Sequence, residues 1–500
     1  MKQPNYKKIP LDGVKCKLTE QIKVTIKPDV LTESVKNVIS VSCFSDVYSI
    51  KVSQKRAEYK GKAIFFVAYE TENGEILKCE STADFDGVLE SECITEKSQV
   101  IGTATAYKTE ADTSGIKLTA IAHVSVEATV IDVKEYECLE NGEDVVCDIT
   151  ENTFLISHGR KETTYPLSEE FTLSYKVKEV LSQNAICVIT NAQCGVGSII
   201  VDGEVYLSAI LLQSSEKKDI IKESKVVPFR IEIDCDDAMP SDMAVCSARV
   251  RAFKTDVSVD DEKSTVNAVI TLKLCAEAFT ESVFSLSHDV FSKTEELDVK
   301  KDVFTARARL EDRCIRKDVN IAVSSEEDFD GCEVLGTFFE RIELISKEKS
   351  GDNLLVTGAL SCSAILRKTD GTLRTLALDF PVDLSIELGT QDFDEYELFA
   401  VCEKSSIRIV DANHLEISAG LIFTLSPYKI KDVNYVKEVV VVGEKQLEED
   451  AISVIIPLAG EDLWSLSKRL NQSPEEIISA NPDISFPLSG EERIVVYRQK

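Results

Sequence analysis

The chain has 500 residues, too many for one ordinary hydrophobic core, so several domains are expected. Its 57 basic and 87 acidic residues give a net charge of -30, which repels nucleic acid and anionic lipid and argues against direct binding to either. Hydrophobic residues make up 43% of the chain and charged residues 29%, proportions that argue against wholesale disorder.

The start of the chain, "MKQPNYKKIPLDG", has lysines but no apolar segment of the kind that follows them in an export signal. No stretch reaches the roughly 18 apolar residues that a spanning helix needs. We therefore expect a cytoplasmic protein with no direct membrane insertion.

A strand pattern recurs three times along the chain. After a glycine, apolar residues occupy every second position, which places one face of a strand on a core. The three stretches are 59–76, 201–220 and 356–373, and their glycines are Gly61, Gly203 and Gly358. The pattern predicts a mainly β protein.

Turn residues follow two of the three stretches. Asn73-Gly74 and Asp370-Gly371 tolerate the positive φ angles of a type I′ turn, so each predicts a tight hairpin. The second stretch has no such pair and is expected to use a longer loop. Some helix between the repeated stretches is possible, and 27–40 is one candidate.

The return strands also align. Phe85, Phe229 and Val382 lie 24, 26 and 24 residues after their glycines, and a further pair of strands follows each hairpin. These agreeing landmarks predict an internal triplication. We expect three β-rich units at 1–145, 146–295 and 296–445. Cys362 then falls at an inward-facing strand position and is expected to pack in a core.

A different pattern follows at 452–498, after an acidic linker. It predicts a strand, two helices and a second strand, a small α+β (βααβ) domain. Asp462 is a good N-cap for a helix that ends at Leu470 and closes on Asn471 in a left-handed conformation. Ser473 and Glu476 form a capping box for the second helix.

The core of this module is expected to come from one apolar face of each helix. The residues are Leu463, Leu466, Leu470, Ile477 and Ile478. Trp464, the only tryptophan of the chain, is expected to pack against the helix pair that carries it.

At these residues the module resembles a LysM domain. The matching stretches are "GEDLWSL" at 460–466, "EIISANP" at 476–482 and "LSG" at 488–490. The resemblance implies a shallow groove that binds N-acetylglucosamine polymers such as peptidoglycan or chitin. By resemblance the groove residues are Gly460, Glu461, Asp462, Leu463, Asn481, Pro482, Asp483 and Ile484.

The module departs from the family at the first groove loop. The family's usual Gly-Asp-Thr is Gly460-Glu461-Asp462 here, so a hydroxyl that donates and accepts becomes an acceptor-only carboxylate. Glu461, Asp462 and Asp483 are expected to form an anionic rim, which disfavours an anionic wall polymer and favours a protein ligand. Reversal of the Glu461 charge is expected to weaken recruitment without unfolding the module.

The body resembles SPOCS repeats, which were formerly a domain of unknown function. The resemblance is carried by the triplicated strand pattern and by return strands such as "VVPFRIEID" at 226–234 and "LDFPVDL" at 378–384. SPOCS repeats followed by a LysM domain are similar to the SipL family of spore-forming Firmicutes. The resemblance implies a non-enzymatic factor of spore coat assembly on the mother-cell side of the forespore membrane. Its implied partner is the coat ATPase called stage IV sporulation protein A. The alternative is a peptidoglycan-binding protein.

The sequence points to neither catalysis nor a cofactor. The four histidines lie in or between predicted strands, and no GxSxG, HExxH or P-loop pattern occurs. The fifteen cysteines include no CxxC, so no zinc site is predicted. Most are expected to be reduced core residues, although Cys187 with Cys194, or Cys138 with Cys147, could bridge in an oxidising compartment.

Overall fold

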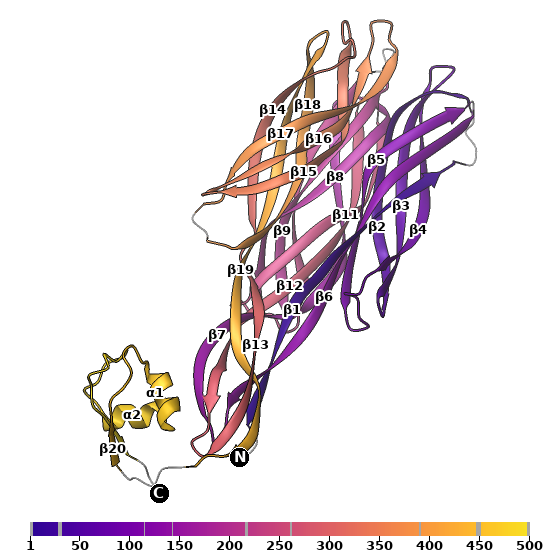
Figure 1. The fold of residues 1–500 in the computed structure, drawn as a ribbon. Coiled ribbons are helices and arrows are strands. Elements are labelled where there is room, and N and C mark those ends of the chain that lie inside the picture. Colours follow the sequence, from indigo (N-terminus) through magenta and orange to yellow (C-terminus); the bar gives the residue numbers. More distant parts are fainter. Residues whose placement is uncertain are drawn as a thin grey trace.

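The protein is mainly β, as predicted (Figure 1). Its computed structural model has 21 strands and two short helices within the residues that it describes. These residues are 4–28, 33–114, 116–142, 144–215, 219–260, 263–389, 392–446 and 452–497.

The first segment of the body contains two antiparallel three-stranded sheets, in the orders β1-β6-β5 and β2-β3-β4. The strands are β1 (Asn5–Ile26), β2 (Val35–Ser53), β3 (Arg56–Thr71), β4 (Ile76–Glu90), β5 (Gln99–Ser114) and β6 (Lys117–Asn141).

The second segment has two sheets in the orders β11-β12-β7 and β10-β9-β8. Its strands are β7 (Val146–Leu173), β8 (Val177–Cys194), β9 (Ser198–Gln213), β10 (Ile220–Asp234), β11 (Met243–Val259) and β12 (Ser264–Phe291).

In the third segment, β19 pairs with β13, β14 and β18, and the other sheet has the order β15-β16-β17. The strands are β13 (Glu295–Arg309), β14 (Arg313–Ser324), β15 (Glu333–Ser350), β16 (Asn353–Arg367), β17 (Leu373–Glu387), β18 (Glu395–Asp411) and β19 (His414–Glu444).

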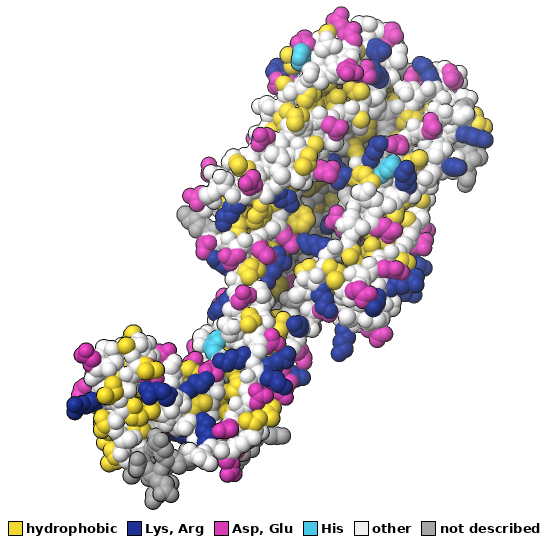
Figure 2. Space-filling view, viewed as in Figure 1, with side chains coloured by type: hydrophobic (Ala, Val, Ile, Leu, Met, Phe, Trp, Pro, Cys, Tyr) yellow, Lys and Arg dark blue, Asp and Glu magenta, His cyan; other side chains and the backbone are white. Residues whose placement is uncertain are grey.

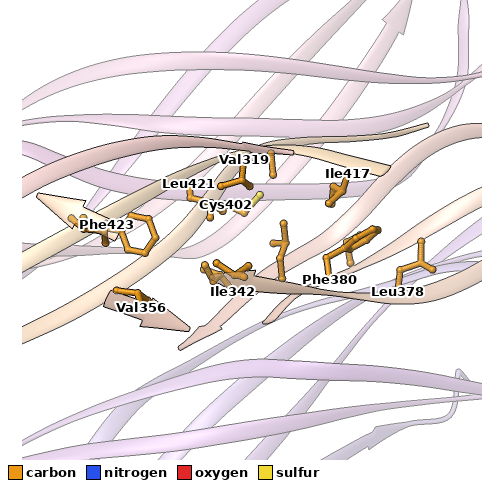
Figure 3. Packing of buried hydrophobic residues seen from close by; sticks show 14 of the residues in the cluster. Val319, Ile342, Val356, Leu378, Phe380, Cys402, Ile417, Leu421 and Phe423 are labelled. Carbon is orange, nitrogen blue, oxygen red and sulfur yellow. The ribbon is translucent and has the colours of Figure 1, made fainter. Parts of the chain in front are cut away.

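Each segment buries a hydrophobic core between its two sheets. In the third segment, Leu378 and Phe380 of β17 lie across the core from Ile417 and Phe423 of β19 (Figure 3). Cys362 is 3% exposed in the same core, which confirms its predicted packing role. In each segment, strands with alternating apolar residues thus form two sheets that pack face to face as a sandwich.

Two further clusters join the three segments. One cluster contains Ile39, Leu181 and Phe338, so β2, β8 and β15 meet there. Aromatic side chains dominate the other, in the stem where the paired strands β1 and β6, β7 and β12, and β13 and β19 run together (Figure 1). There Tyr136 stacks on Phe304 with ring centroids 4.3 Å apart. These shared clusters make the body a single packed structure.

Two local predictions are wrong. The candidate helix at 27–40 is replaced from Val35 by strand β2, while 29–32 lie outside the described residues. The hairpins at Gly74 and Gly371 are present, but only the glycine of each pair has a positive φ. The amide of each glycine donates to the carbonyl three residues earlier, at Thr71 and Lys368. These are type I turns closed by a glycine bulge, with a three-residue loop in place of type I′.

The second hairpin uses a longer loop, as predicted, because its closing bond runs from the Gln213 amide to the Asp219 carbonyl. All fifteen cysteines have free thiols, including the pairs Cys187 with Cys194 and Cys138 with Cys147. Neither of the helices that the structure describes has the length and apolar character to cross a membrane.

Candidate functional site

The end of the chain folds into a small module beside the stem of the body (Figure 1). Its elements are β20 (Ile452–Ile455), α1 (Leu463–Leu470), α2 (Pro474–Ala480) and β21 (Ile494–Tyr497). The strands β20 and β21 pair antiparallel. The buried core of the module consists of Leu466, Leu470, Ile477, Leu488, Ile494 and Val496.

Local capping fixes where both helices begin. The Asp462 carboxylate accepts a hydrogen bond from the Ser465 amide at 2.7 Å, which caps α1 as predicted. Asn471 ends that helix with a φ of 55°, also as predicted. The predicted capping box of α2 is formed by Ser473 and Glu476, each bonding the other's backbone amide.

Glu461 has a structural role that the sequence pattern does not reveal. Its carboxylate accepts hydrogen bonds from Arg469 Nε and Nη2 at 2.8 and 2.7 Å and from the Leu458 amide at 3.0 Å. The side chain is only 5% exposed, and the Arg469 guanidinium holds the pKa of the carboxyl below its usual range. Glu461 therefore joins the loop before α1 to the last turn of that helix, and the prediction that it forms part of an exposed anionic rim is wrong.

Asn481 fastens the loop after α2. Its buried side chain donates to the carbonyls of Ile477 and Val495, at 2.9 and 2.8 Å, and accepts from the Val495 amide at 2.7 Å. One amide side chain thus ties the end of α2 to β21. Truncating it would leave buried backbone groups of both elements without partners.

The predicted groove residues divide into three groups. Gly460, Asp462, Pro482 and Asp483 are exposed, whereas Glu461 and Asn481 are buried, and Leu463 and Ile484 pack against the core. Within residues 452–497, no hydrogen bond or ion pair joins the two predicted groove loops directly. Leu488 instead bonds the first loop through the backbone of Gly460 and Glu461. Ile478, predicted to be in the core, is 50% exposed.

Trp464 contacts the body. Its ring meets Phe291 of β12 edge-on, with centroids 5.3 Å apart, and its indole N–H donates to the Asp289 carboxylate at 2.9 Å. The prediction that this side chain packs mainly against its own helix pair is therefore wrong. An aromatic residue with a polar tip suits a contact that is apolar on one side and polar on the other.

Asp289 is the centre of this contact. A bulge between Ser287 and Asp289 interrupts the β12–β7 ladder, and such bulges redirect side chains. The carboxylate accepts from Lys468 of α1 at 2.7 Å and from Lys301 of β13 at 2.9 Å, besides the bond from Trp464. Burial opposes ionisation, but these three donors outweigh it and hold the pKa of Asp289 far below its usual range.

Two lysines of the body complete the contact. Lys293 pairs with Glu476 of α2 at 2.7 Å. Lys445 donates to the Asn471 side chain at 2.5 Å and to the Ser292 carbonyl at 2.8 Å. Because most of these groups are partly exposed, each bond adds modestly, and the module is held by their sum.

We expect Asp289→Asn to release the module from the body in a larger fraction of the molecules. An amide cannot pair with two lysines, so the loss is about 1–2 kcal/mol of docking free energy. Because Trp464 is the only tryptophan, its emission should shift to longer wavelength in the variant. The exposed strand residue Asp298 supplies the control, and Asp298→Asn should leave the emission unchanged.

The same contact predicts a pH dependence. Docking lowers the Asp289 pKa below the value that it has beside Lys301 alone, so the stabilisation is complete above that undocked value and is lost as the pH falls from there toward the docked value. A titration of Trp464 emission should show this acid release in the wild type. An equal acid response in Asp289→Asn would show that another group controls docking.

An apolar strip covers the outer face of the β20–β21 sheet and continues on the segment after β20; it is defined as Ile452, Val454, Ile456, Leu458 and Tyr497. These side chains are 55–68% exposed, while the alternate residues Ile494 and Val496 of β21 are buried under the helices. Figure 2 shows hydrophobic side chains gathered on this part of the module. A concentrated apolar surface of this kind typically marks a contact with another protein.

The body has a cleft of about 1060 Å³ between its three segments, visible as a hollow in Figure 2. Several of its charged side chains bridge neighbouring segments. Arg251 pairs with Asp46 at 3.0 Å, and Glu340 pairs with Lys222 at 2.5 Å. These ion pairs help to hold the segments together along the cleft.

Comparisons of the chain with family models, with curated proteins and with solved structures find no match.

Proposed function

We propose that this protein is a non-enzymatic scaffold of spore envelope assembly, in which the body is structural and the C-terminal module recruits a protein partner. The observation that carries the proposal is the apolar strip. It lies on the sheet face opposite the core and on the exposed segment after β20, whereas Trp464 of α1 contacts the body. The module can therefore remain docked while the strip meets a partner.

The body is proposed to contain three SPOCS-like repeats. One support is the strand pairing: in each segment a long final strand pairs with the first, and three consecutive strands between them form a separate sheet. A second support is the register of the three glycines. The register pairs are Gly61 with Phe85, Gly203 with Phe229, and Gly358 with Val382.

Bulges give a third support for the repeats. On the other neighbouring strand, the glycines pair with Val47, Ile189 and Leu344. A register shift follows directly after each of these three partners. Independent sequences would have little reason to place a bulge at the same point three times, so we infer a common ancestral unit.

The module is proposed to be LysM-like, and its partner a coat ATPase like stage IV sporulation protein A. Both assignments rest on the sequence resemblance, as does a location on the mother-cell side of the forespore membrane. An apolar surface favours a protein over a glycan, because a glycan needs polar groups placed to bind its hydroxyls. The exposed rim of Gly460, Asp462, Pro482 and Asp483 keeps glycan binding as the alternative.

The test is a titration of the full chain with the purified ATPase and, separately, with chitin oligomers. We expect the wild type to bind the ATPase, and Ile456→Asp to weaken that binding by at least about tenfold, the equivalent of 1.4 kcal/mol. A charge in the strip would have to be desolvated on binding. Chitin binding should be weak in both proteins.

The control is Ile345→Asp, which places the same charge at an exposed isoleucine of β15 in the body. This variant should bind the ATPase as the wild type does. Tight binding of chitin without capture of the ATPase would replace the scaffold proposal by the glycan-binding alternative.

A further inference from the structure

Two cysteines far apart in the sequence lie together in the first segment. Cys16 is in β1, and Cys93 is in the loop between β4 and β5. The Ser91 hydroxyl lies 3.9 Å from Cys16 Sγ and accepts a hydrogen bond from the Cys93 amide at 3.2 Å. Ser91 therefore lies next to both cysteines, and both of them are partly exposed.

The surroundings of the two thiols differ in a consistent way. Hydrogen bonds from Ser91 and Cys16 lower the pKa of Cys93, and Lys15 adds to the effect. Burial raises the pKa of Cys16, and its hydrogen bond to Cys93 raises it further. Cys93 is therefore the thiol that ionises first, with Cys16 holding a proton beside it.

The remaining cysteines provide an internal comparison. Burial raises the pKa of twelve of them, which makes them poor nucleophiles. They are Cys43, Cys79, Cys138, Cys147, Cys187, Cys194, Cys235, Cys246, Cys275, Cys314, Cys362 and Cys402. Cys314 is the most useful of these because it is exposed and still has a raised pKa.

We propose that Cys93 is a site of oxidation by hydroperoxides, and that Cys16 resolves the product to an intramolecular disulfide. The basis is two partly exposed cysteines that meet at one serine hydroxyl, on two chain segments that the fold brings together. The inference is independent of the scaffold proposal, since it concerns the body alone.

The chemistry balances with a hydroperoxide as the only oxidant. The Cys93 thiolate attacks the terminal oxygen, the O–O bond breaks, and the departing alkoxide or hydroxide takes a proton, leaving a sulfenic acid on Cys93. Cys16 Sγ then attacks Cys93 Sγ, the S–O bond breaks, and water leaves with the Cys16 proton. Two thiols and one hydroperoxide give a disulfide, an alcohol or water, and one further water.

The disulfide would join a strand of one sheet of the first segment to the loop that connects its two sheets. Cys16 lies in the β1-β6-β5 sheet, while Cys93 follows β4 of the other sheet. A cross-link between residues so far apart in sequence restricts the unfolded chain. The oxidised protein should therefore unfold at a higher urea concentration than the reduced protein.

The experiment treats the full reduced chain with equimolar hydrogen peroxide and locates the products by peptide mass spectrometry. In the wild type we expect a Cys16–Cys93 disulfide as the first product, with the loss of two hydrogen atoms. In Cys16→Ser, dimedone should trap a sulfenic acid on Cys93. In Cys93→Ser, Cys16 should stay reduced.

The exposed thiol Cys314 tests whether exposure alone controls the reaction. Cys93 should be oxidised several-fold faster than Cys314 in the same sample. Equal rates, or a first disulfide between any other pair, would overturn the proposal. A circular dichroism spectrum unchanged in both serine variants shows that each is folded, so a missing product then counts against the inference.

Discussion

Replacing Glu461 by lysine is expected to unfold the C-terminal module while leaving the body folded. The carboxylate is almost wholly buried and accepts hydrogen bonds from Nε and Nη2 of Arg469 and from the Leu458 amide. A lysine would place two cations together and leave the Leu458 amide without its acceptor. Loss of a buried pair costs about 3–5 kcal/mol, toward the lower end here because Arg469 is partly exposed. A module of fewer than 50 residues has a small free energy of unfolding, so a loss of this size is expected to unfold it.

Limited proteolysis of the full chain measures this effect. The Glu461→Lys protein should be cleaved rapidly between Ile452 and Tyr497, and Trp464 emission should shift to longer wavelength. Glu475→Lys is the control, because Glu475 is exposed in the first turn of α2 and its reversal costs only a few tenths of a kcal/mol. A module that stays protected in Glu461→Lys would show that the Glu461 side chain is exposed after all.

Gly358→Ala is expected to destabilise the body by about 2–3 kcal/mol. A Cβ at this position would collide with the Glu343 carbonyl oxygen and lie 3.2 Å from the carbonyl carbon. Both are backbone atoms of the paired strand, so no side chain can rotate away. The same conflict recurs at Gly61 and Gly203, where the Cβ would lie 2.7 Å from the carbonyl oxygens of Asp46 and Val188.

Urea unfolding of the three alanine variants provides the measurement, with Gly13→Ala as the control. Gly13 also lies in a strand, but its nearest neighbour would be 4.0 Å from the added carbon. We expect lower midpoints for all three variants and no decrease for the control. A neutral effect at any one of the three positions would argue that its surroundings differ from those of the other two.

The strands of the body could be predicted because their signals are local. Alternating apolar residues after Gly203, for instance, mark the face of β9 that packs on the core. The turn type could not be predicted from Asn73-Gly74, because the pair suits both a type I′ turn and a type I turn with a glycine bulge. The false helix at 27–40 failed because tertiary pairing with β3 prevailed over local propensity.

The helix caps of the module were predictable for the same reason, since Asp462 and Ser473 act on amides three residues away. The role of Glu461 could not be predicted, because its partner Arg469 lies in the last turn of α1, outside the range of the local capping pattern. The docking of Trp464 on Phe291 joins residues 173 positions apart, and no sequence period reports such a contact. The apolar strip was visible as alternation in 452–458, but its outward direction required the fold.

The central claim is that the module recruits a protein through the apolar strip while remaining docked on the body. Hydrogen exchange of the full chain, with and without the coat ATPase, tests it most directly. We expect the partner to slow exchange at 452–458 and 494–497, with little change at the predicted groove loops, Gly460–Leu463 and 481–484. Protection confined to those loops, or no protection of the module in a complex that forms, would contradict the account.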